Sequence, residues 1–188
     1  MPHQNVVVLT APSGAGKTTI AHRVLDDMPE MQFSVSATTR EARPDETDGD
    51  DYHFLSTREF ERRIEAGDLL EYEEVYPGQF YGTLRSEIES KSADGPVLLD
   101  IDVEGALNVK EAFGDDALVI FVAPPSKEEL RERLKGRGTE DADALARRLE
   151  RADRELAKRN AFDAVVVNDD LDMAVEETLG RIRQFLKS

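Results

Sequence analysis

The residues best suited to chemistry lie near the start of the chain, in the run Ala11-Pro12-Ser13-Gly14-Ala15-Gly16-Lys17-Thr18. Two glycines allow the backbone to curl so that its N–H groups face one concavity, and the positive end of a following helix adds to their attraction for a polyphosphate. Lys17 then suits the β and γ phosphates, and the Thr18 hydroxyl suits Mg²⁺. The sequence therefore predicts a phosphate-binding loop with the contacts Ser13, Gly14, Ala15, Gly16, Lys17, Thr18 and Thr19.

One position of this loop departs from the usual motif, because Ala11 stands where the first glycine is expected. A strand-turn-helix connection whose glycines only make the turn is the alternative interpretation. The context favours phosphate binding, since the apolar strand at residues 6–10, the lysine and the start of a helix occur together.

A second phosphate site is predicted in residues 37–44, a hydroxyl-rich segment that carries Arg40 and Arg43. Guanidinium groups make bidentate, charge-assisted hydrogen bonds with phosphate oxygens, and hydroxyls can satisfy the remaining lone pairs. An exposed polar loop has the same composition and remains the alternative for this segment.

Two carboxylates, Asp100 and Asp102, follow an apolar run that begins at Pro96. Side chains alternate along a strand, so we expect both aspartates on one face of an extended strand. Open α/β sheets bind ligands at strand ends, and a carboxylate beside a phosphate-binding loop commonly holds Mg²⁺ directly or through water. We therefore expect Thr18 and Asp100 to be magnesium ligands; polar residues that merely end a strand are the alternative.

The elements that position these residues follow from apolar runs and helical spacing. Short apolar runs predict buried strands at residues 6–10, 96–102, 118–122 and 164–167. Helices are expected after Gly16, at 105–113, after a Ser126 cap, at 144–160 and at 171–186. Strands that alternate with helices imply an α/β fold, with a central parallel sheet and helices on both faces.

The middle third of the chain interrupts this alternation. Residues 52–55, 69–76 and 80–83 predict short strands, with a helix capped by Thr57 between the first two. We expect a small insertion with its own mixed sheet. Its tyrosines fit half-buried sheet positions better than ligand contacts when they are considered alone; they are Tyr52, Tyr72, Tyr76 and Tyr81.

Composition limits the class of protein and its partners. The chain has 188 residues, 39% of them hydrophobic, which suits one globular domain, and it has no cysteine for a disulfide or a Cys-based zinc site. The net charge of -16 argues against nonspecific binding to nucleic acid or an anionic membrane, whereas a local arginine cluster can still bind a nucleotide. No apolar run reaches the roughly 18 residues of a membrane span and no signal peptide is recognisable, so we expect a cytoplasmic protein.

Charged runs are expected on the solvated surface. Residues 45–51 are rich in carboxylates and predict a solvated loop, and residues 131–141 predict a mobile basic loop. The following helix carries arginines that fit a solvated face paired with acidic residues at i to i+4 spacing; they are Arg147, Arg148, Arg151 and Arg154. The excess of Asp and Glu, together with few Lys, also suggests adaptation to a salty cytoplasm.

In their order and spacing these segments resemble guanylate kinase, a P-loop nucleoside monophosphate kinase family. The resemblance covers almost the whole chain and is carried by residues 11–18, 36–43, 49–54, 80–83, 99–105, 133–139 and 167–170. Ala11 is frequent in bacterial members of that family. The resemblance implies a single domain over residues 1–188, with a core at about 1–33, 91–126 and 158–188, a GMP-binding insertion at about 34–90 and a helical lid at about 127–157.

The implied activity is transfer of a phosphoryl group from ATP to GMP, and to dGMP, with Mg²⁺, as part of purine nucleotide metabolism. The implied partners are these small molecules, not nucleic acid or a membrane, for a monomer or a homodimer. The resemblance assigns the GMP phosphate to Arg40, Arg43, Tyr52 and Tyr81, with Asp100 beside the substrate. It assigns guanine to Ser36, Glu71, Thr83 and Asp102.

Glu71 suits discrimination between bases, because a carboxylate accepts hydrogen bonds from both N1–H and the 2-amino group of guanine, which adenine lacks. Such a site can reject the wrong base by about 10⁴. On the ATP side, Arg133, Arg137 and Arg148 resemble lid arginines and Asn168 lies near the expected adenine. Lys17, Arg40, Arg137 and Arg148 are thereby implied to be catalytic.

The sequence departs from the common family pattern at two places. Residues 73–79 are one residue longer than in familiar members, and the proline expected before Arg43 is replaced by Ala42, with Pro44 after it. Three rival classes remain. A scaffold module would have a degraded phosphate loop, another small-molecule kinase would lack Glu71 and Ser36, and a GTPase would carry a base-reading motif that residues 168–172 do not match.

Overall fold

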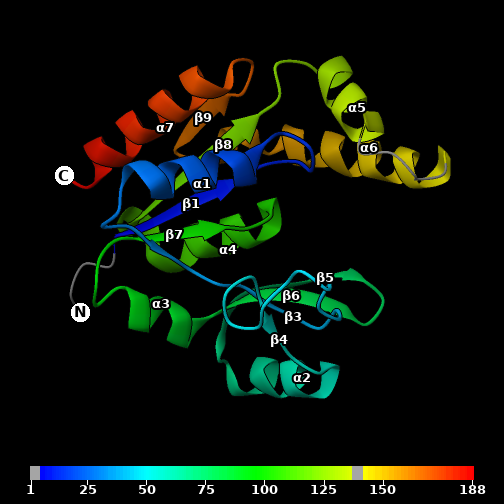
Figure 1. The fold of residues 1–188 in the computed structure, drawn as a ribbon, viewed down its shortest axis with the longest axis vertical. Helices are drawn as coiled ribbons and strands as arrows, with labels where there is room; N and C mark the ends of the chain where they lie inside the picture. Colours follow the sequence, from blue (N-terminus) through cyan, green and yellow to red (C-terminus); the bar gives the residue numbers. More distant parts are fainter. Residues whose placement is uncertain (1–4, 137–141) are drawn as a thin grey trace.

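The computed structural model describes residues 5–136 and 142–188, which form two sheets with helices packed against them (Figure 1). The central sheet has five strands in the order β2-β7-β1-β8-β9. These strands are β1 (Val6–Thr10), β2 (Gln32–Phe33), β7 (Val97–Asp100), β8 (Ala117–Ala123) and β9 (Ala164–Val167). Every neighbouring pair runs parallel, which confirms the predicted α/β class.

Strand β1 lies at the centre of this sheet and is buried on both faces. The helices that cover the two faces are α1 (Lys17–Asp27) with α7 (Leu171–Phe185) on one side and α4 (Val103–Phe113) on the other. Val7 and Leu9 pack toward α1 and α7, whereas Val6 and Val8 pack toward α4. Alternate strand residues point to opposite faces, so a doubly covered strand requires the continuous apolar run found here.

The second sheet belongs to the insertion and has four strands in the order β4-β3-β6-β5. They are β3 (Ala37–Thr38), β4 (His53–Phe54), β5 (Leu69–Tyr76) and β6 (Gln79–Leu84), with helices α2 (Thr57–Ala66) and α3 (Arg85–Lys91). Strands β3 and β4 are parallel and the other neighbours are antiparallel, which confirms the predicted mixed sheet. Phe60 of α2 is fully buried in a small core with Leu69 and Leu84.

Two helix starts differ from the sequence prediction. Ser56, not Thr57, caps α2, because Ser56 has the extended backbone of an N-cap and its hydroxyl accepts the Glu59 N–H at 3.2 Å. Strand β7 ends at Asp100, and Asp102 caps α4 by accepting the Gly105 N–H at 2.8 Å. The expectation that both aspartates continue one strand is therefore wrong, since the second carboxylate serves a helix end.

Helices α5 (Lys127–Gly136) and α6 (Ala142–Ala157) pack on one another through Leu130, Leu134 and Ala152. Ser126 caps α5 as predicted, with its hydroxyl accepting the Glu129 N–H at 3.0 Å. Residues 131–136 continue this helix, so the expected basic loop is wrong for them. The rest of that predicted loop, including Arg137, lies outside the described residues. Helix α6 ends before the expected Asn160, and a 3₁₀ turn follows at Arg159–Ala161.

Within residues 5–136 and 142–188, every helix is too short or too polar to cross a membrane.

Gly82 is the position where the insertion sheet leaves least room, which gives a test of its packing. A Cβ there would lie 2.6 Å from the Glu71 carbonyl oxygen and 2.9 Å from Tyr72 Cβ on the paired strand. We expect Gly82→Ala to lower the free energy of unfolding by about 1 to 3 kcal/mol, because backbone must move to accept the methyl group. Urea titration followed by circular dichroism measures this change.

Gly180→Ala is the matched control. Gly180 lies in α7, and outside its own helix backbone no heavy atom lies within 4 Å of the place that an added methyl group would take. Alanine favours a helix over glycine by up to about 1 kcal/mol, so this variant should be as stable as the wild type or more so. A Gly82→Ala protein as stable as Gly180→Ala would contradict the packing described for β5 and β6.

Candidate active site

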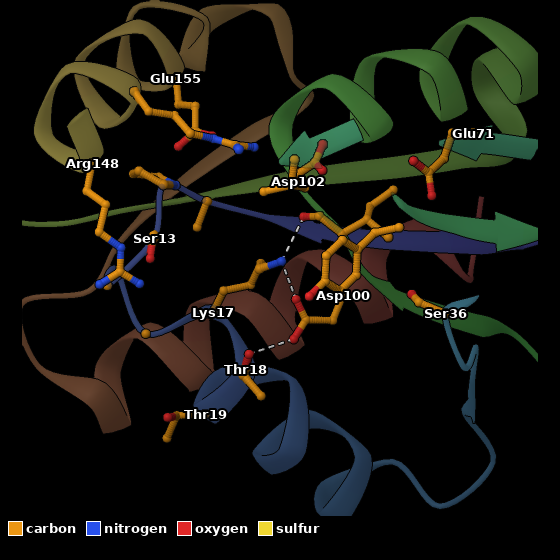
Figure 2. Close-up of a pocket in the computed structure, with 18 of the residues that line it drawn as sticks. Ser13, Lys17, Thr18, Thr19, Ser36, Glu71, Asp100, Asp102, Arg148 and Glu155 are labelled. Atoms are coloured by element: carbon orange, nitrogen blue, oxygen red, sulfur yellow. Dashed lines mark hydrogen bonds and ion pairs between the residues drawn. The ribbon is translucent and has the colours of Figure 1, made fainter. Parts of the chain in front are cut away.

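A cavity of about 400 Å³ lies at the carboxyl ends of β1 and β7, where ligands bind in open α/β sheets (Figure 2). Its walls come from parts of the chain that are distant in sequence. The loop after β1 supplies one wall, strands β5 and β6 supply another, and α6 closes a third side. The sequence-predicted residues that line it are Ser13, Gly14, Gly16, Lys17, Thr18, Thr19, Ser36, Tyr52, Glu71, Tyr81, Asp100, Asp102 and Arg148.

The loop that begins α1 has the backbone expected for binding an anion. Gly14 and Gly16 have φ values of +89° and +93°, a region that favours glycine, and the Ala15 N–H donates to the Pro12 carbonyl at 3.1 Å. A Cβ on Gly16 would lie 2.2 Å from the amide nitrogen of Asn168. Both glycines are thus required by conformation, and Gly16 also by close packing.

Asn168 is buried behind this loop. Its side-chain amide donates to the Ala15 carbonyl at 2.8 Å, and its own carbonyl accepts from Arg133 at 3.1 Å. The Asn168 amide therefore braces the phosphate loop, and Arg133 connects α5 to the same point. The assignment of these two residues to ATP stays a prediction.

Lys17, Thr18 and Asp100 form one cluster below the loop (Figure 2). Lys17 forms an ion pair with Asp100 and donates to the Ile101 carbonyl at 2.8 Å. The Thr18 hydroxyl donates to the other carboxylate oxygen of Asp100 at 2.8 Å. The register of β1 against β7 explains why these three side chains lie together, because Leu9 pairs with Asp100 and the loop continues from the end of β1.

The oxygens of Thr18 and Asp100 fit Mg²⁺, a hard cation that takes oxygen ligands and usually keeps waters and substrate phosphates in its shell. Among the residues that the structure describes, no three His, Cys, Asp or Glu side chains converge on one metal position. A cation held here would thus have few protein ligands, which is the mode of binding typical of Mg²⁺ beside phosphates.

Arg40 lies in the insertion, where the predicted phosphate clamp is only partly assembled. Its guanidinium makes a fork of two 2.6 Å hydrogen bonds to Glu46, donates to the Tyr81 hydroxyl at 3.2 Å and lies 4.9 Å from the centre of the Tyr52 ring. Three of the four predicted clamp residues therefore meet. The side chain of Arg43 is exposed on the same loop.

Glu46 was not anticipated as a site residue, because residues 45–51 resemble a solvated acidic loop. Its side chain is only 12% exposed, and the hydrogen bonds from Arg40 and from the Arg43 N–H lower the pKa of its carboxyl to about 2. The expectation of a fully solvated loop is therefore wrong for Glu46. The useful signal was spacing, since Glu46 follows Arg40 across a tight turn closed by its own N–H and the Arg43 carbonyl.

Glu71 is buried on β5, where the Thr83 hydroxyl donates to its carboxylate at 2.6 Å. A Cβ on Gly105 would lie 2.5 Å from the second Glu71 oxygen, so the first turn of α4 approaches this carboxylate closely. Burial raises the pKa of Glu71 to about 7, and the nearby charge of Asp102 adds to the effect. Ser36 lines the same side of the cavity (Figure 2). The predicted base-binding residues are thus brought together.

Helix α6 presents more to the cavity than the sequence indicated. Arg148 extends toward the loop that carries Ser13 (Figure 2), and its assignment to ATP stays a prediction. Arg151 and Glu155 also line the cavity, whereas Arg151 was expected on a solvated face. That expectation is wrong for Arg151. Positions 148, 151 and 155 share one helix face, and this spacing is the signal that could have identified them.

The raised pKa of Glu71 gives a pH test of the site. A carboxyl with a pKa of 4.5 in the unfolded chain and about 7 in the folded protein binds more protons when folded, so stability is lost as pH rises between these values. We expect the free energy of unfolding of the wild type to fall by about 3 kcal/mol relative to Glu71→Gln between pH 4.5 and 8, at 1.36 kcal/mol per pKa unit.

Glu59→Gln is the control for this measurement. The hydrogen bond from Arg62 lowers the pKa of Glu59, so its contribution does not change between pH 5 and 8. Parallel stability curves for the wild type and Glu71→Gln over this range would show that Glu71 ionises normally.

Comparison with known proteins agrees with this architecture. A family profile described as guanylate kinase matches residues 3–185. A guanylate kinase of Salinibacter ruber is 74% identical over 188 residues and all of both chains, and that of Chlorobaculum tepidum is 50% identical over 96% of this chain and 93% of its own.

Solved structures give the same result. The crystal structure of guanylate kinase from Anaplasma phagocytophilum matches with a TM-score of 0.77 and 34% identity, over 96% of this chain and 85% of that one. A gluconokinase from Sinorhizobium meliloti matches with a TM-score of 0.54 at 18% identity, over 98% and 94%, and shows a shared fold alone. With its phosphate loop, mixed-sheet insertion and full-length similarity, the chain is a kinase that belongs to the guanylate kinase family.

Proposed function

We propose that this chain transfers the γ-phosphoryl group of ATP to GMP, and also to dGMP, in a Mg²⁺-dependent reaction. One observation carries the proposal: the phosphate loop with Lys17 lines the same cavity as the buried Glu71, whose carboxylate accepts a hydrogen bond from Thr83. A donor phosphate and an acceptor base can therefore be held in the same space. Purine nucleotide metabolism in the cytoplasm is the setting that this activity fits, for a chain that acts as a monomer or a homodimer.

On the donor side, the loop N–H groups and Lys17 bind the ATP phosphates, with Arg133, Arg148 and Asn168 as further contacts. Thr18 and Asp100 would hold Mg²⁺, which would supply positive charge that stabilises the transferring phosphoryl group. In the structure, Lys17 pairs with Asp100 and donates to the Ile101 carbonyl. These two contacts keep its ammonium group beside the loop. We assign this part of the reaction to a core that includes residues 1–33, 91–126 and 158–188, with a lid at 127–157.

On the acceptor side, the insertion at residues 34–90 holds GMP. Arg40, Arg43, Tyr52 and Tyr81 orient its phosphate, and Ser36, Glu71, Thr83 and Asp102 bind guanine. Ionised Glu71 accepts from N1–H and the 2-amino group, while Thr83 fixes the carboxylate by a 2.6 Å hydrogen bond. These contacts are made to the base and the phosphate, and none of them is made to the ribose. The proposal therefore includes dGMP as a substrate.

The chemistry requires positioning and charge stabilisation more than proton transfer. The GMP phosphate is already ionised near neutral pH, so it can attack in line without a general base. Lys17 and Arg148 stabilise charge on the transferring group, and Arg40 orients the nucleophile. Closure around the substrates excludes water, which limits hydrolysis of ATP.

A coupled assay of ADP release with five acceptors tests the proposal directly. We expect rapid turnover with GMP and dGMP. With AMP, CMP and UMP we expect kcat/KM to be at least about 10³-fold lower, because their bases do not offer the buried Glu71 carboxylate the paired N1–H and 2-amino donors of guanine. Addition of EDTA should abolish turnover, and Mg²⁺ should restore it. The absence of turnover with all five acceptors would contradict the proposal and favour a scaffold role.

Charge removal at Lys17 and Arg40 tests the two phosphate sites separately. Lys17→Ala should lower kcat by on the order of 10² to 10³-fold, and Arg40→Ala should lose most turnover and raise the KM for GMP, because each removes a charge-assisted contact. Circular dichroism should show that both variants remain folded. Steady-state kinetics with varied ATP and varied GMP separate the two effects.

The matched controls carry the same charge change at exposed ion pairs. Arg23 lies on α1 with Lys17 and pairs with Asp172, and Arg62 lies in the insertion and pairs with Glu59, so Arg23→Ala and Arg62→Ala each remove an exposed ion pair. Both controls should retain near-normal rates. Near-normal rates in Lys17→Ala or Arg40→Ala would refute the roles given to these residues.

A further inference from the structure

Arg151 connects two parts of the cavity wall that are 78 residues apart in sequence. Its Nε donates to Glu155 on the same helix at 2.8 Å, and one of its terminal nitrogens donates to Glu73 of β5 at 3.0 Å. The three side chains are largely shielded, with exposed fractions of 33% for Arg151, 23% for Glu73 and 11% for Glu155. A pair with this geometry and shielding differs from an ordinary surface ion pair.

Glu73 continues this connection toward the base pocket. Side chains two residues apart on a strand point to the same face, so Glu73 shares a face of β5 with the buried Glu71. Arg151 donates to Glu73 on this face, and burial raises the pKa of the Glu73 carboxyl. The contact therefore joins α6 to the strand that carries Glu71.

The same helix face carries Arg148, one turn before Arg151. Residues three apart on a helix lie on one face, so the bond between Arg151 and Glu73 fixes the rotation of α6 that directs Arg148 toward the phosphate loop (Figure 2). Arg154 offers the contrast. It pairs with Glu150 at the same i, i+4 spacing as Arg151 with Glu155, but both partners are about two-thirds exposed.

We propose that Arg151 is a positioning residue for phosphoryl transfer: by bridging Glu73 and Glu155, it holds α6 so that Arg148 faces the phosphate loop, and it links that placement to β5, the strand that carries Glu71. This inference rests on the proposed function and adds a residue to it. The guanidinium fork is essential to the bridge, because two separate N–H groups serve carboxylates on two elements.

The kinetic test compares Arg151→Ala, Arg151→Lys and Glu73→Ala with the control Arg154→Ala. We expect Arg151→Ala and Glu73→Ala to lower kcat by about 10- to 100-fold while the KM for GMP changes less than about 3-fold, since a misplaced Arg148 acts on the transition state. Arg151→Lys should recover part of the rate, because one ammonium reaches only one of the two carboxylates well. Arg154→Ala should match the wild type.

Two further variants separate positioning from general stability. Glu73→Gln keeps an acceptor for Arg151, so it should retain nearly the wild-type kcat. The double variant Arg151→Ala/Glu73→Ala should be no slower than either single variant, because both remove the same contact. Equal kcat in Arg151→Ala and Arg154→Ala, or multiplicative losses in the double variant, would overturn the inference.

Hydrogen exchange of the protein without substrates provides a readout that does not depend on activity. Amides of α6 should exchange faster in Arg151→Ala and Glu73→Ala than in the wild type and Arg154→Ala. Unchanged exchange would overturn the bridge even if all variants turn over GMP. Conversely, failure of the wild type to phosphorylate GMP would overturn the proposed function, and the exchange result would still decide whether Arg151 anchors α6.

Discussion

The structure depends first on the parallel pairing of β1 with β7. This register places Leu9 beside Asp100, so the loop that leaves β1 begins next to the carboxylate that ends β7. Lys17 and Thr18 both contact that carboxylate, which ties the first turn of α1 to the neighbouring strand. A shift of one residue in the register would turn the apolar side chains of β1 toward the opposite faces and separate the loop from Asp100. The core and the candidate active site are therefore fixed by the same pairing.

A second constraint is electrostatic. The chain has a net charge of -16, yet its cavity has to attract phosphates. Three cations near the cavity are each held by a carboxylate: Lys17 by Asp100, Arg40 by Glu46 and Arg151 by Glu73 and Glu155. These pairs keep long side chains oriented, and a phosphate dianion can compete with a single carboxylate for the same donors because it carries more charge. These ion pairs thus keep cations available at the cavity, so the protein can bind anions there although its net charge is strongly negative.

Local sequence patterns predicted much of the fold, including the bounds of β1, β5 and β9. These elements have strong apolar runs, and the loop at residues 11–18 has its whole context within one strand-loop-helix unit. The errors have different causes, and only one of them is a contact with a partner distant in sequence. Asp102 caps a helix because α4 begins there. Glu46 and Arg151 were both assigned to solvated charged runs. Glu46 is shielded by Arg40 across a local turn, whereas Arg151 is shielded by Glu73, which is 78 residues away in sequence. The helix face shared by positions 148, 151 and 155 was visible in the sequence, but its direction was not, because the position of β5 against α6 follows from the folded insertion.

Burial of Glu71 explains how a pocket can discriminate between bases without contacting every atom of the base. A carboxylate removed from water is unfavourable unless donors replace the lost hydration, which is why its pKa rises to about 7. Thr83 supplies one donor and guanine would supply two more. Adenine has no N1–H and no 2-amino group, so it would leave a buried charge without those donors or require Glu71 to remain protonated. In the proposed function, the cost of burying the carboxylate is therefore the source of the selectivity. The Thr83 hydroxyl fixes the orientation of that carboxylate toward the base.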